Sequence, residues 1–393
     1  MAKLKILMAN YEFPPIGGGA GNAHLSLLKE YARTGQLDVD VLTSGPKPGF
    51  SLEQFSQNIT VYRVGLHKKA LHFWRRREVI EWLLKAKRPY RRLLRKNSYD
   101  LIHAFFGFPT GWLCYRSSDR IPYIISLRGS DVPGIHSRLQ LDYKILGPLF
   151  KAIWRKAAAI VACSEGLKKR ALAFLPSASI DVIANGVDLD RFHPAPTNGP
   201  HDTLRLVTVG RLSVTKRVEL LMQAAEILHE TGCTVRLTIV GGGPLEGRLR
   251  EYARQTTMRE TVSITGSVEQ EKISELYRQH DVFVSASAQE GMSNAMLEAM
   301  ASGLPIVTTA CEGTEELIGD NGIVVENATP PLIAEAIRTL AASEQRRKTM
   351  SHAAGEKAKS FAWPSIADQY IRCYEKVLGG PAGTAGPKNS CAE

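Results

Sequence analysis

The chain has 393 residues, of which 44% are apolar and 23% are charged, and its formal net charge is +11. This length predicts two domains of ordinary size, and the composition excludes both a small disulfide-stapled scaffold and a long disordered chain. The six cysteines lie far apart, without the CxxC or Cys/His spacing of a structural zinc site. They are typical of reduced thiols in a cytoplasmic protein.

The sequence predicts neither an export signal nor a membrane-spanning segment. Residues 1–9 form a short apolar strand pattern after two lysines, too short for the apolar part of a signal peptide. No run approaches the roughly 18 consecutive apolar residues that a membrane helix requires. We therefore expect any membrane contact to be peripheral, on the inner face of the cytoplasmic membrane.

Apolar runs of strand length alternate with stretches of helical period along the whole chain. This alternation is typical of α/β proteins, and it predicts two Rossmann-like, doubly wound domains whose ligands bind outside the carboxyl ends of the strands. Helices are predicted at 20–33 and 73–95, among others. The predicted strands are 4–9, 39–43, 60–64, 101–105, 123–127, 159–163, 181–183, 204–209, 235–240, 262–265, 282–285, 306–309 and 323–325.

A proline-rich segment separates the two predicted domains. Residues 191–203 hold three prolines and no apolar periodicity, which indicates an exposed linker. We expect an N-terminal domain over 1–190, a second domain over 204–360, and a disordered Gly/Pro/Ala-rich tail over 379–393. The net charge is +14 before residue 191 and −3 from there on. Opposite charges predict different partners for the two halves.

Two loops of the first domain follow predicted strands. Gly17, Gly18 and Gly19 precede the first helix, where consecutive glycines let backbone N–H groups approach an anion or a sugar. A tight turn is the structural alternative. Arg128 and Asp131, in the sequence RGSD, follow the fifth strand. Arginine suits phosphate, and the aspartate can accept hydrogen bonds from a sugar or cap the turn.

Residues 210–217, GRLSVTKR, follow the first strand of the second domain. Arg211 and Lys216 can converge there on a diphosphate and stabilise the negative charge of its leaving oxygen. A solvated charged surface is the alternative. The position at the carboxyl end of a strand favours a binding site.

Residues 290–305, EGMSNAMLEAMASGLP, carry the most information. Ser293 or Asn294 is predicted to cap a helix, with Glu290 on the preceding loop and Glu298 about one turn inside. The helix N-terminus attracts phosphate, and the two carboxylates suit hydroxyl-rich groups on either side. A diphosphate joined to two hydroxyl-rich groups matches the helix N-terminus and the two carboxylates together. Two solvated glutamates are the alternative, which the apolar neighbours disfavour.

Four smaller features allow both structural and functional interpretations. Residues 241–244 form another strand-to-helix glycine turn, and Val268 follows a strand where backbone groups can meet a base edge. His24 and His103 are single histidines in apolar settings, which favours a place in the core over catalysis.

Together, the glycine loop, RGSD, residues 185–188 (NGVD), GRLSVTKR, the 241–244 turn and the E-x7-E element resemble the GT4 family of retaining glycosyltransferases. The likeness covers nearly the whole chain. It implies the GT-B fold, with two domains facing across a cleft and a C-terminal helix over 361–378 that returns to the first domain. It also implies sugar transfer from a nucleoside-diphosphate donor to a glycan or lipid-linked acceptor in polysaccharide or lipopolysaccharide biosynthesis.

The resemblance implies a role for each motif. Arg211 and Lys216 would bind the donor diphosphate and assist its departure, Glu298 would hold the ribose, and Glu290 would contact the transferred sugar. The family needs neither a metal nor a cofactor. Asp188 and Asp190 have the DxD spelling of a metal-binding motif, but residues 185–188 resemble the family's turn after a strand. The remaining substrate-binding positions are Gly17, Gly18, Gly19, Arg128, Asp131, Val268, Gly291, Met292, Ser293, Asn294 and Ala295.

The chain departs from the family at one position. Many relatives carry histidine where Arg128 stands, and a permanently protonated arginine cannot act as a base. Either Arg128 assists with phosphate or acceptor, or the histidine role is dispensable here. A GT-B-fold sugar-nucleotide epimerase and a catalytically silent nucleotide-sugar-binding protein are the alternative functions.

Residues 67–96 hold twelve Lys/Arg against Glu78 and Glu81, interleaved with aromatic and leucine side chains. A basic helix of this kind suits the surface of an anionic bilayer. Nucleic acid is the competing partner, but no nucleic-acid-binding motif accompanies the segment, so we expect none to bind. A merely solvated helix is the third interpretation.

Overall fold

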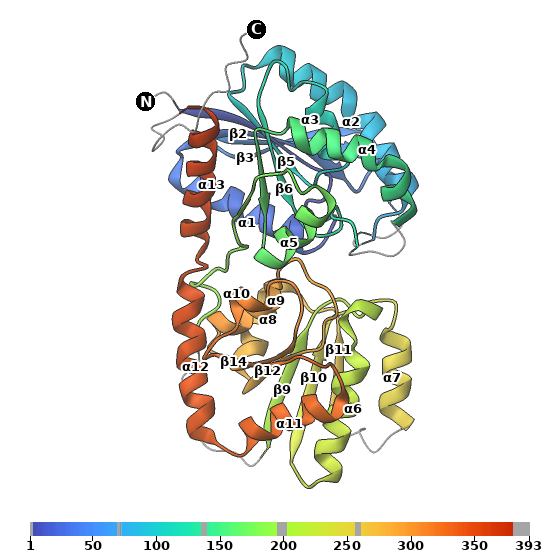
Figure 1. Ribbon diagram of the computed structural model, residues 1–393, viewed down its shortest axis with the longest axis vertical. Coiled ribbons are helices and arrows are strands. Elements are labelled where there is room, and N and C mark those ends of the chain that lie inside the picture. Colours follow the sequence, from blue (N-terminus) through green and yellow to red (C-terminus); the bar gives the residue numbers. More distant parts are fainter. Residues whose placement is uncertain are drawn as a thin grey trace. The chain divides into compact units, whose positions relative to one another are not determined.

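The computed structural model describes residues 3–68, 71, 73–134, 140–194, 203–255 and 261–379. Contacts within the chain divide it into two compact α/β units (Figure 1). Unit 1 contains the chain up to Ala162, Ala171–Ile183 and the chain from Ile366 onward, and unit 2 contains Cys163–Arg170 and Ala184–Ser365. The predicted tail after residue 379 and most of the predicted linker, 195–202, lie outside the described residues.

The sheet of unit 1 has eight strands in the order β3-β4-β2-β1-β5-β6-β7-β8. Adjacent strands of this sheet run parallel, except that β3 and β4 form an antiparallel hairpin at the outer edge. The strand order reverses between β1 and β5, which makes this pair the topological switch point. The strands are β1 (Leu4–Asn10), β2 (Leu37–Gly45), β3 (Phe50–Ser56), β4 (Ile59–Gly65), β5 (Leu101–Phe105), β6 (Tyr123–Leu127), β7 (Ala159–Ala162) and β8 (Ile180–Val182).

Helices cover both faces of this sheet, as in a doubly wound fold (Figure 1). Helices α2, α3 and α4 lie on one face, and α1 and α13 lie on the other. Helix α5 begins in unit 2, and α13 enters unit 1 at Ile366. The helices are α1 (Gly19–Thr34), α2 (Arg76–Lys96), α3 (Thr110–Tyr115), α4 (Gln140–Lys156), α5 (Glu165–Phe174) and α13 (Trp363–Val377).

The sheet of unit 2 is parallel throughout, with the order β11-β10-β9-β12-β13-β14 and a switch point between β9 and β12. Its strands are β9 (Leu204–Val209), β10 (Val235–Val240), β11 (Val262–Gly266), β12 (Val282–Ser285), β13 (Ile306–Thr309) and β14 (Gly322–Val325). Its helices are α6 (Val218–Glu230), α7 (Glu246–Gln255), α8 (Gln270–Arg278), α9 (Asn294–Ala301), α10 (Thr314–Leu317), α11 (Pro330–Ala341) and α12 (Glu344–Lys359), and a 3-10 turn spans Val214–Lys216.

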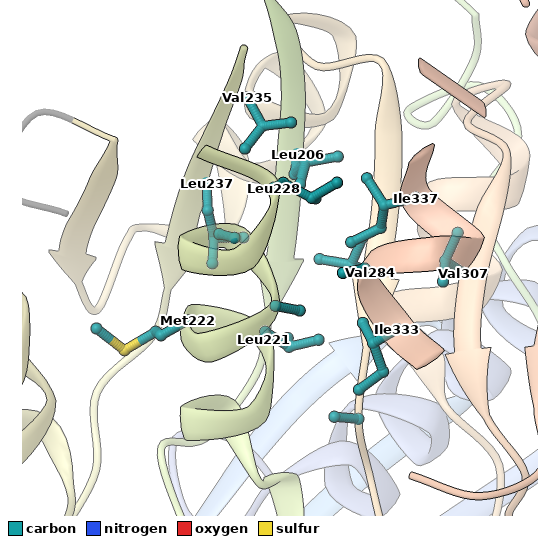
Figure 2. Close-up of a cluster of buried hydrophobic side chains, with 14 of the residues drawn as sticks. Leu206, Leu221, Met222, Leu228, Val235, Leu237, Val284, Val307, Ile333 and Ile337 are labelled. Atoms are coloured by element: carbon teal, nitrogen blue, oxygen red, sulfur yellow. The ribbon is translucent and has the colours of Figure 1, made fainter. Parts of the chain in front are cut away.

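One apolar core holds unit 2 together. Leu221 of α6 and Ile333 of α11 pack with Leu206, Leu237 and other strand residues in a buried cluster (Figure 2). Full burial of a leucine or isoleucine side chain contributes about 1.5–3 kcal/mol relative to exposure. This core fixes the strands, and therefore the loops that leave their carboxyl ends.

The predicted strands all match observed ones to within two residues at each end, and the fold class is confirmed. Strand β3 was not predicted, because its sequence, FSLEQFS, lacks apolar alternation and its first five residues are exposed. Phe192, in the predicted linker, is buried against Tyr277. Within the described residues, no helix combines the length and hydropathy needed to cross a bilayer.

Candidate active site

The loops that follow β9 and β12 meet at the switch point of unit 2. The Lys216 ammonium donates a hydrogen bond to the Glu290 carboxylate, and the two side chains form an ion pair. The backbone N–H of Ala288 donates to the Thr215 carbonyl at 2.8 Å, which joins the two loops directly. Two residues that the sequence analysis assigned to one site are therefore in contact.

A small niche opens between these two loops. It leaves about 10 Å³ for the centre of a water-sized molecule, which is enough room for one water. Its lining combines two cationic and four hydroxyl side chains with apolar residues, and the cations and hydroxyls suit an anionic oxygen. The lining residues are Thr208, Val209, Gly210, Arg211, Leu212, Lys216, Val218, Val240, Phe283, Ser285, Ser287 and Ser293.

Glu290 is held by its neighbours as well as by Lys216. The Ser287 hydroxyl donates to Glu290 Oε1 at 2.9 Å, and the backbone N–H of Glu290 donates to Glu312 Oε2 at 3.2 Å. Glu312 in turn pairs with Arg170. Lys216 and Ser287 thus hold the Glu290 carboxylate, and Glu312 holds its backbone. The sequence carried no local signal for Glu312 or Arg170.

Arg217 is a second residue that the sequence analysis did not single out. It has a φ of 47°, and its guanidinium donates to the carbonyls of Ala286 at 2.7 Å and Ser287 at 3.1 Å, and to Thr309 Oγ1 at 3.3 Å. These bonds tie the end of the β9 loop to the segment after β12. Arg217 is therefore a positioning residue for Glu290.

Helix α9 begins where the sequence predicted. Ser293 is its N-cap, and its hydroxyl accepts the N–H of Met296 at 3.3 Å. The first N–H groups of a helix lack intrahelical partners, so this end attracts anions. The Asn294 side chain accepts a hydrogen bond from Asn185 Nδ2 at 2.8 Å. Asn294 thus fixes the NGVD turn, a structural role that the sequence analysis did not anticipate.

Glu298 lies half-buried on α9, where the Tyr277 hydroxyl donates to its Oε2 at 3.2 Å. Burial raises the pKa of the Glu298 carboxyl to about 7, although Tyr277 and the charge of Arg191 oppose the rise. Near neutral pH this carboxyl exists in both forms, so a ligand that donates hydroxyl groups to it favours the ionised form.

The backbones of the loops after β9 and β10 lie in close contact. A Cβ atom on Gly241, whose φ is 135°, would lie 1.9 Å from the Gly210 carbonyl oxygen, so only glycine fits. Val268 follows β11, two strands from β9, and strands lie about 4.8 Å apart. Val268 therefore follows a strand at the same edge of the sheet as the cationic loop, two strands away.

In unit 1, Asp131 organises the carboxyl edge of the sheet. Its carboxylate accepts the backbone N–H of Gly107 at 2.7 Å and of Arg128 at 2.8 Å. Burial raises the pKa of Asp131, while these backbone bonds favour its ionised form. The turn-capping alternative for Asp131 is thus present in the structure. Gly18 caps the N-terminus of α1, which Gly19 begins.

Arg128 is held from two sides. Its guanidinium donates to the Tyr370 hydroxyl at 3.1 Å and lies 4.7 Å from the ring centroid of Phe105. His103 is buried and hydrogen-bonded through both ring nitrogens, to Tyr374 and Ser126. Burial, with the charge of Arg128, lowers the pKa of His103 well below its usual value. The core interpretation of His103 therefore fits the structure.

A further polar cluster near the glycine loop has no counterpart in the sequence analysis. Burial raises the pKa of both Tyr11 and Glu12. Lys68 is paired with Glu78 at 3.0 Å, and its ammonium lies 3.9 Å from the ring centroid of Trp74. No short motif marks this cluster, because its members come from separate segments.

Asp188 acts within a turn. Its Oδ1 accepts the backbone N–H groups of Asp190 and Arg191, both at 3.1 Å. Over the ranges that the structure describes, no group of three or more His, Cys, Asp or Glu side chains has the arrangement of a metal site.

Comparisons with known proteins agree with this geometry. Residues 17–191 match the model of Glycosyltransferase Family 4, and residues 203–343 match that of Glycosyl transferases group 1. The spore coat protein SA of Bacillus subtilis is 30% identical over 311 residues, which cover 72% of this chain and 80% of the relative. The chain belongs to glycosyltransferase family 4.

Two further relatives are similar to different lengths of this chain. An uncharacterized glycosyltransferase of Methanocaldococcus jannaschii is 26% identical and is aligned over 95% of this chain and 99% of the relative. The amylovoran biosynthesis glycosyltransferase of Erwinia amylovora is 31% identical over 47% of this chain and 44% of its own length. This family 4 protein is therefore a transferase with relatives in polysaccharide biosynthesis.

Solved structures share its GT-B fold. Sucrose-phosphate synthase from Thermosynechococcus elongatus has a TM-score of 0.81 at 22% identity, covering 96% of this chain and 99% of that one. HepE from Anabaena, in complex with UDP-glucose, has a TM-score of 0.73 at 19% identity, covering 95% and 100%. At these identities the likeness concerns the fold.

Proposed function

We propose that this glycosyltransferase moves a sugar, with retention of configuration and without a metal ion, from a nucleoside-diphosphate donor to a glycan or lipid-linked acceptor. The Lys216–Glu290 ion pair at the switch point carries the proposal. It joins a cation suited to a departing phosphate with a carboxylate suited to sugar hydroxyls. We further propose a cytoplasmic role in polysaccharide or lipopolysaccharide biosynthesis. The amylovoran relative supports the first of these two pathways.

The donor extends along the carboxyl edge of unit 2. Arg211, Lys216 and the start of α9 bind the diphosphate. Glu290 accepts a hydrogen bond from the transferred sugar, and ionised Glu298 accepts bonds from the ribose. The base lies toward Val268. The solved complex of HepE with UDP-glucose supports this class of donor.

During transfer, the bond between the sugar carbon and the phosphate oxygen breaks, and negative charge develops on the diphosphate. Lys216 and Arg211 stabilise that charge, which is why we propose that no metal ion is needed. The acceptor hydroxyl attacks from the face that the diphosphate leaves and passes its proton to the departing phosphate oxygen, so retention requires no nucleophile from the enzyme. In unit 1, the glycine loop and Arg128 offer contacts for acceptor hydroxyl or phosphate groups.

A transfer assay with a panel of sugar nucleotides, in the presence of a chelator, tests this function. The expected product forms only with acceptor and retains the donor's anomeric configuration by NMR. Lys216→Ala should lower kcat/KM at least about hundredfold. Lys348→Ala, an exposed lysine on α12, should not change it. Conversion of the donor without acceptor would instead indicate an epimerase, and binding without turnover a silent binding protein.

A further inference from the structure

An open groove lies on unit 1, between the edge hairpin and helix α2. Its volume is about 400 Å³. It lies at the outer edge of the sheet, three strands from the switch point between β1 and β5. The residues that line it are Gly49, Phe50, Val64, Gly65, Lys85, Arg88, Pro89 and Arg92.

The groove combines an apolar wall with a cationic one. Phe50 is 53% exposed and forms the apolar wall with Val64 and Pro89. Lys85, Arg88 and Arg92 follow one another at helical spacing, so their side chains lie on one face of α2. The lining contains no carboxylate. An anionic group attached to an apolar one matches both walls.

Most cations of α2 are not paired with carboxylates in the part of the chain that the structure describes. Glu81 binds Lys85 at 2.6 Å and His67 at 3.0 Å, and Glu78 is buried against Lys68. No described residue forms an ion pair with seven other cations of this helix, which are Arg77, Lys87, Arg88, Arg91, Arg92, Arg95 and Lys96. A merely solvated helix gains from i,i+4 pairs of opposite charge, and α2 has none of them beyond Lys85.

Large aliphatic side chains are exposed among these cations. Ile80 and Leu84, one turn apart on α2, are 54% and 68% exposed. The buried face of the helix, with Trp82, already packs within unit 1, so Ile80 and Leu84 have no role in that core. The helix has 21 residues and is roughly 30 Å long, so it presents an extended surface.

We infer that this surface of α2 docks on an anionic phospholipid bilayer, with the phosphate of one head group in the groove against Arg88 and Arg92. Ile80, Leu84 and Phe50 then enter the boundary between head groups and acyl chains. Charge complementarity selects anionic lipids. Single-stranded nucleic acid instead prefers several aromatic stacking platforms among the cations, whereas the exposed apolar residues of α2 are aliphatic and Phe50 is the aromatic side chain that lines the groove. This docking is independent of the proposed sugar transfer.

Backbone geometry shapes the groove where β4 ends. A Cβ atom on Gly65 would lie 2.0 Å from the Lys47 carbonyl oxygen, and Lys85 Nζ donates to the Gly65 carbonyl at 3.2 Å. The hairpin and the helix are therefore joined at this residue. The head-group site is thus built from two fixed elements.

Flotation of the full chain with vesicles tests the inference. We expect binding to vesicles with about 30% phosphatidylserine in phosphatidylcholine, much weaker binding in about 0.5 M salt, and none to phosphatidylcholine alone. Arg88→Gln/Arg92→Gln should weaken the partition coefficient about thirtyfold, since each cation near the surface contributes roughly fivefold. Arg248→Gln/Arg346→Gln removes two exposed cations of unit 2 and should leave binding unchanged.

The other arms distinguish the alternatives. Ile80→Ser/Leu84→Ser should weaken binding about tenfold or more at either salt concentration. Inorganic phosphate at millimolar concentration should not displace the vesicles. The inference would be overturned if the two arginine double variants lost vesicle binding equally, or if the wild type did not bind anionic vesicles at low salt. It would also be overturned if an oligonucleotide bound more tightly than vesicles through the same arginines. The wild-type comparison of lipid compositions decides the matter even if a variant fails to fold.

Discussion

The Tyr370 hydroxyl of α13 accepts a hydrogen bond from the guanidinium of Arg128 at the carboxyl end of β6, at 3.1 Å. The same hydroxyl lies 3.2 Å from Ser126 Oγ, which lies 2.7 Å from His103 Nε2. His103 Nδ1 continues the chain to Tyr374 at 2.8 Å. The C-terminal helix therefore positions Arg128.

Tyr370→Phe should reduce the free energy of unfolding by about 1–2 kcal/mol, because it leaves Arg128 and Ser126 without this partner. Chemical denaturation measures the loss. The control is Tyr115→Phe, since the Tyr115 hydroxyl makes no hydrogen bond to any residue within the described ranges. If Tyr115→Phe reduced the free energy of unfolding as much as Tyr370→Phe, the hydrogen bonds of Tyr370 would not contribute specifically to stability.

Gly241→Ala should destabilise unit 2 by several kcal/mol, because the new methyl group meets the Gly210 carbonyl in a backbone conformation that side chains rarely adopt. Gly247→Ala on α7 is the matched control, because a Cβ there contacts nothing within 4 Å. That control should be neutral or stabilising by up to about 1 kcal/mol. Denaturation curves that give the two variants similar stability would contradict the close approach.

His24→Gln should flatten the acid side of the stability profile. Burial and the charge of Arg128 lower the pKa of His24 to about 3 in the folded protein. The unfolded chain therefore binds more protons below about pH 6.5, and this residue removes up to about 1.4 kcal/mol of stability per pH unit as the pH falls. Denaturation at pH 7, 6 and 5 should give a shallower slope for the variant. An unchanged slope would mean that His24 is protonated in the folded state.

Nucleotide affinity should depend on the ionisation of Glu298, whose pKa burial raises to about 7. If the ionised carboxylate binds the ribose, affinity for a nucleoside diphosphate falls by up to about tenfold per pH unit below 7. Calorimetric titration at pH 8 and pH 6 measures this, and in Glu298→Gln the dependence should fall to that of the ligand's own terminal phosphate, whose second pKa is about 6. The same raised pKa makes the folded form lose stability as the pH rises from about 4.5 to 7.

Local patterns predicted most of the fold and part of the site. The buried strands are short segments rich in apolar residues, and the Ser293 cap stands immediately before its helix, so periodicity and capping identified both. The edge strand β3 was missed, because its exposure leaves no apolar pattern. Glu312 and Arg217 were missed because they act through contacts with distant segments. The partner of Arg128 likewise lies 242 residues away in sequence, on α13.

The most direct test is calorimetric titration of nucleoside diphosphates into the wild-type protein, Lys216→Ala and Lys348→Ala. We predict that one diphosphate binds the wild type and the Lys348 variant equally. Lys216→Ala should weaken the affinity for that diphosphate at least about tenfold, as expected for the loss of a hydrogen bond between charged groups. Equal affinities for all three proteins would contradict a diphosphate site at the β9–β12 switch point.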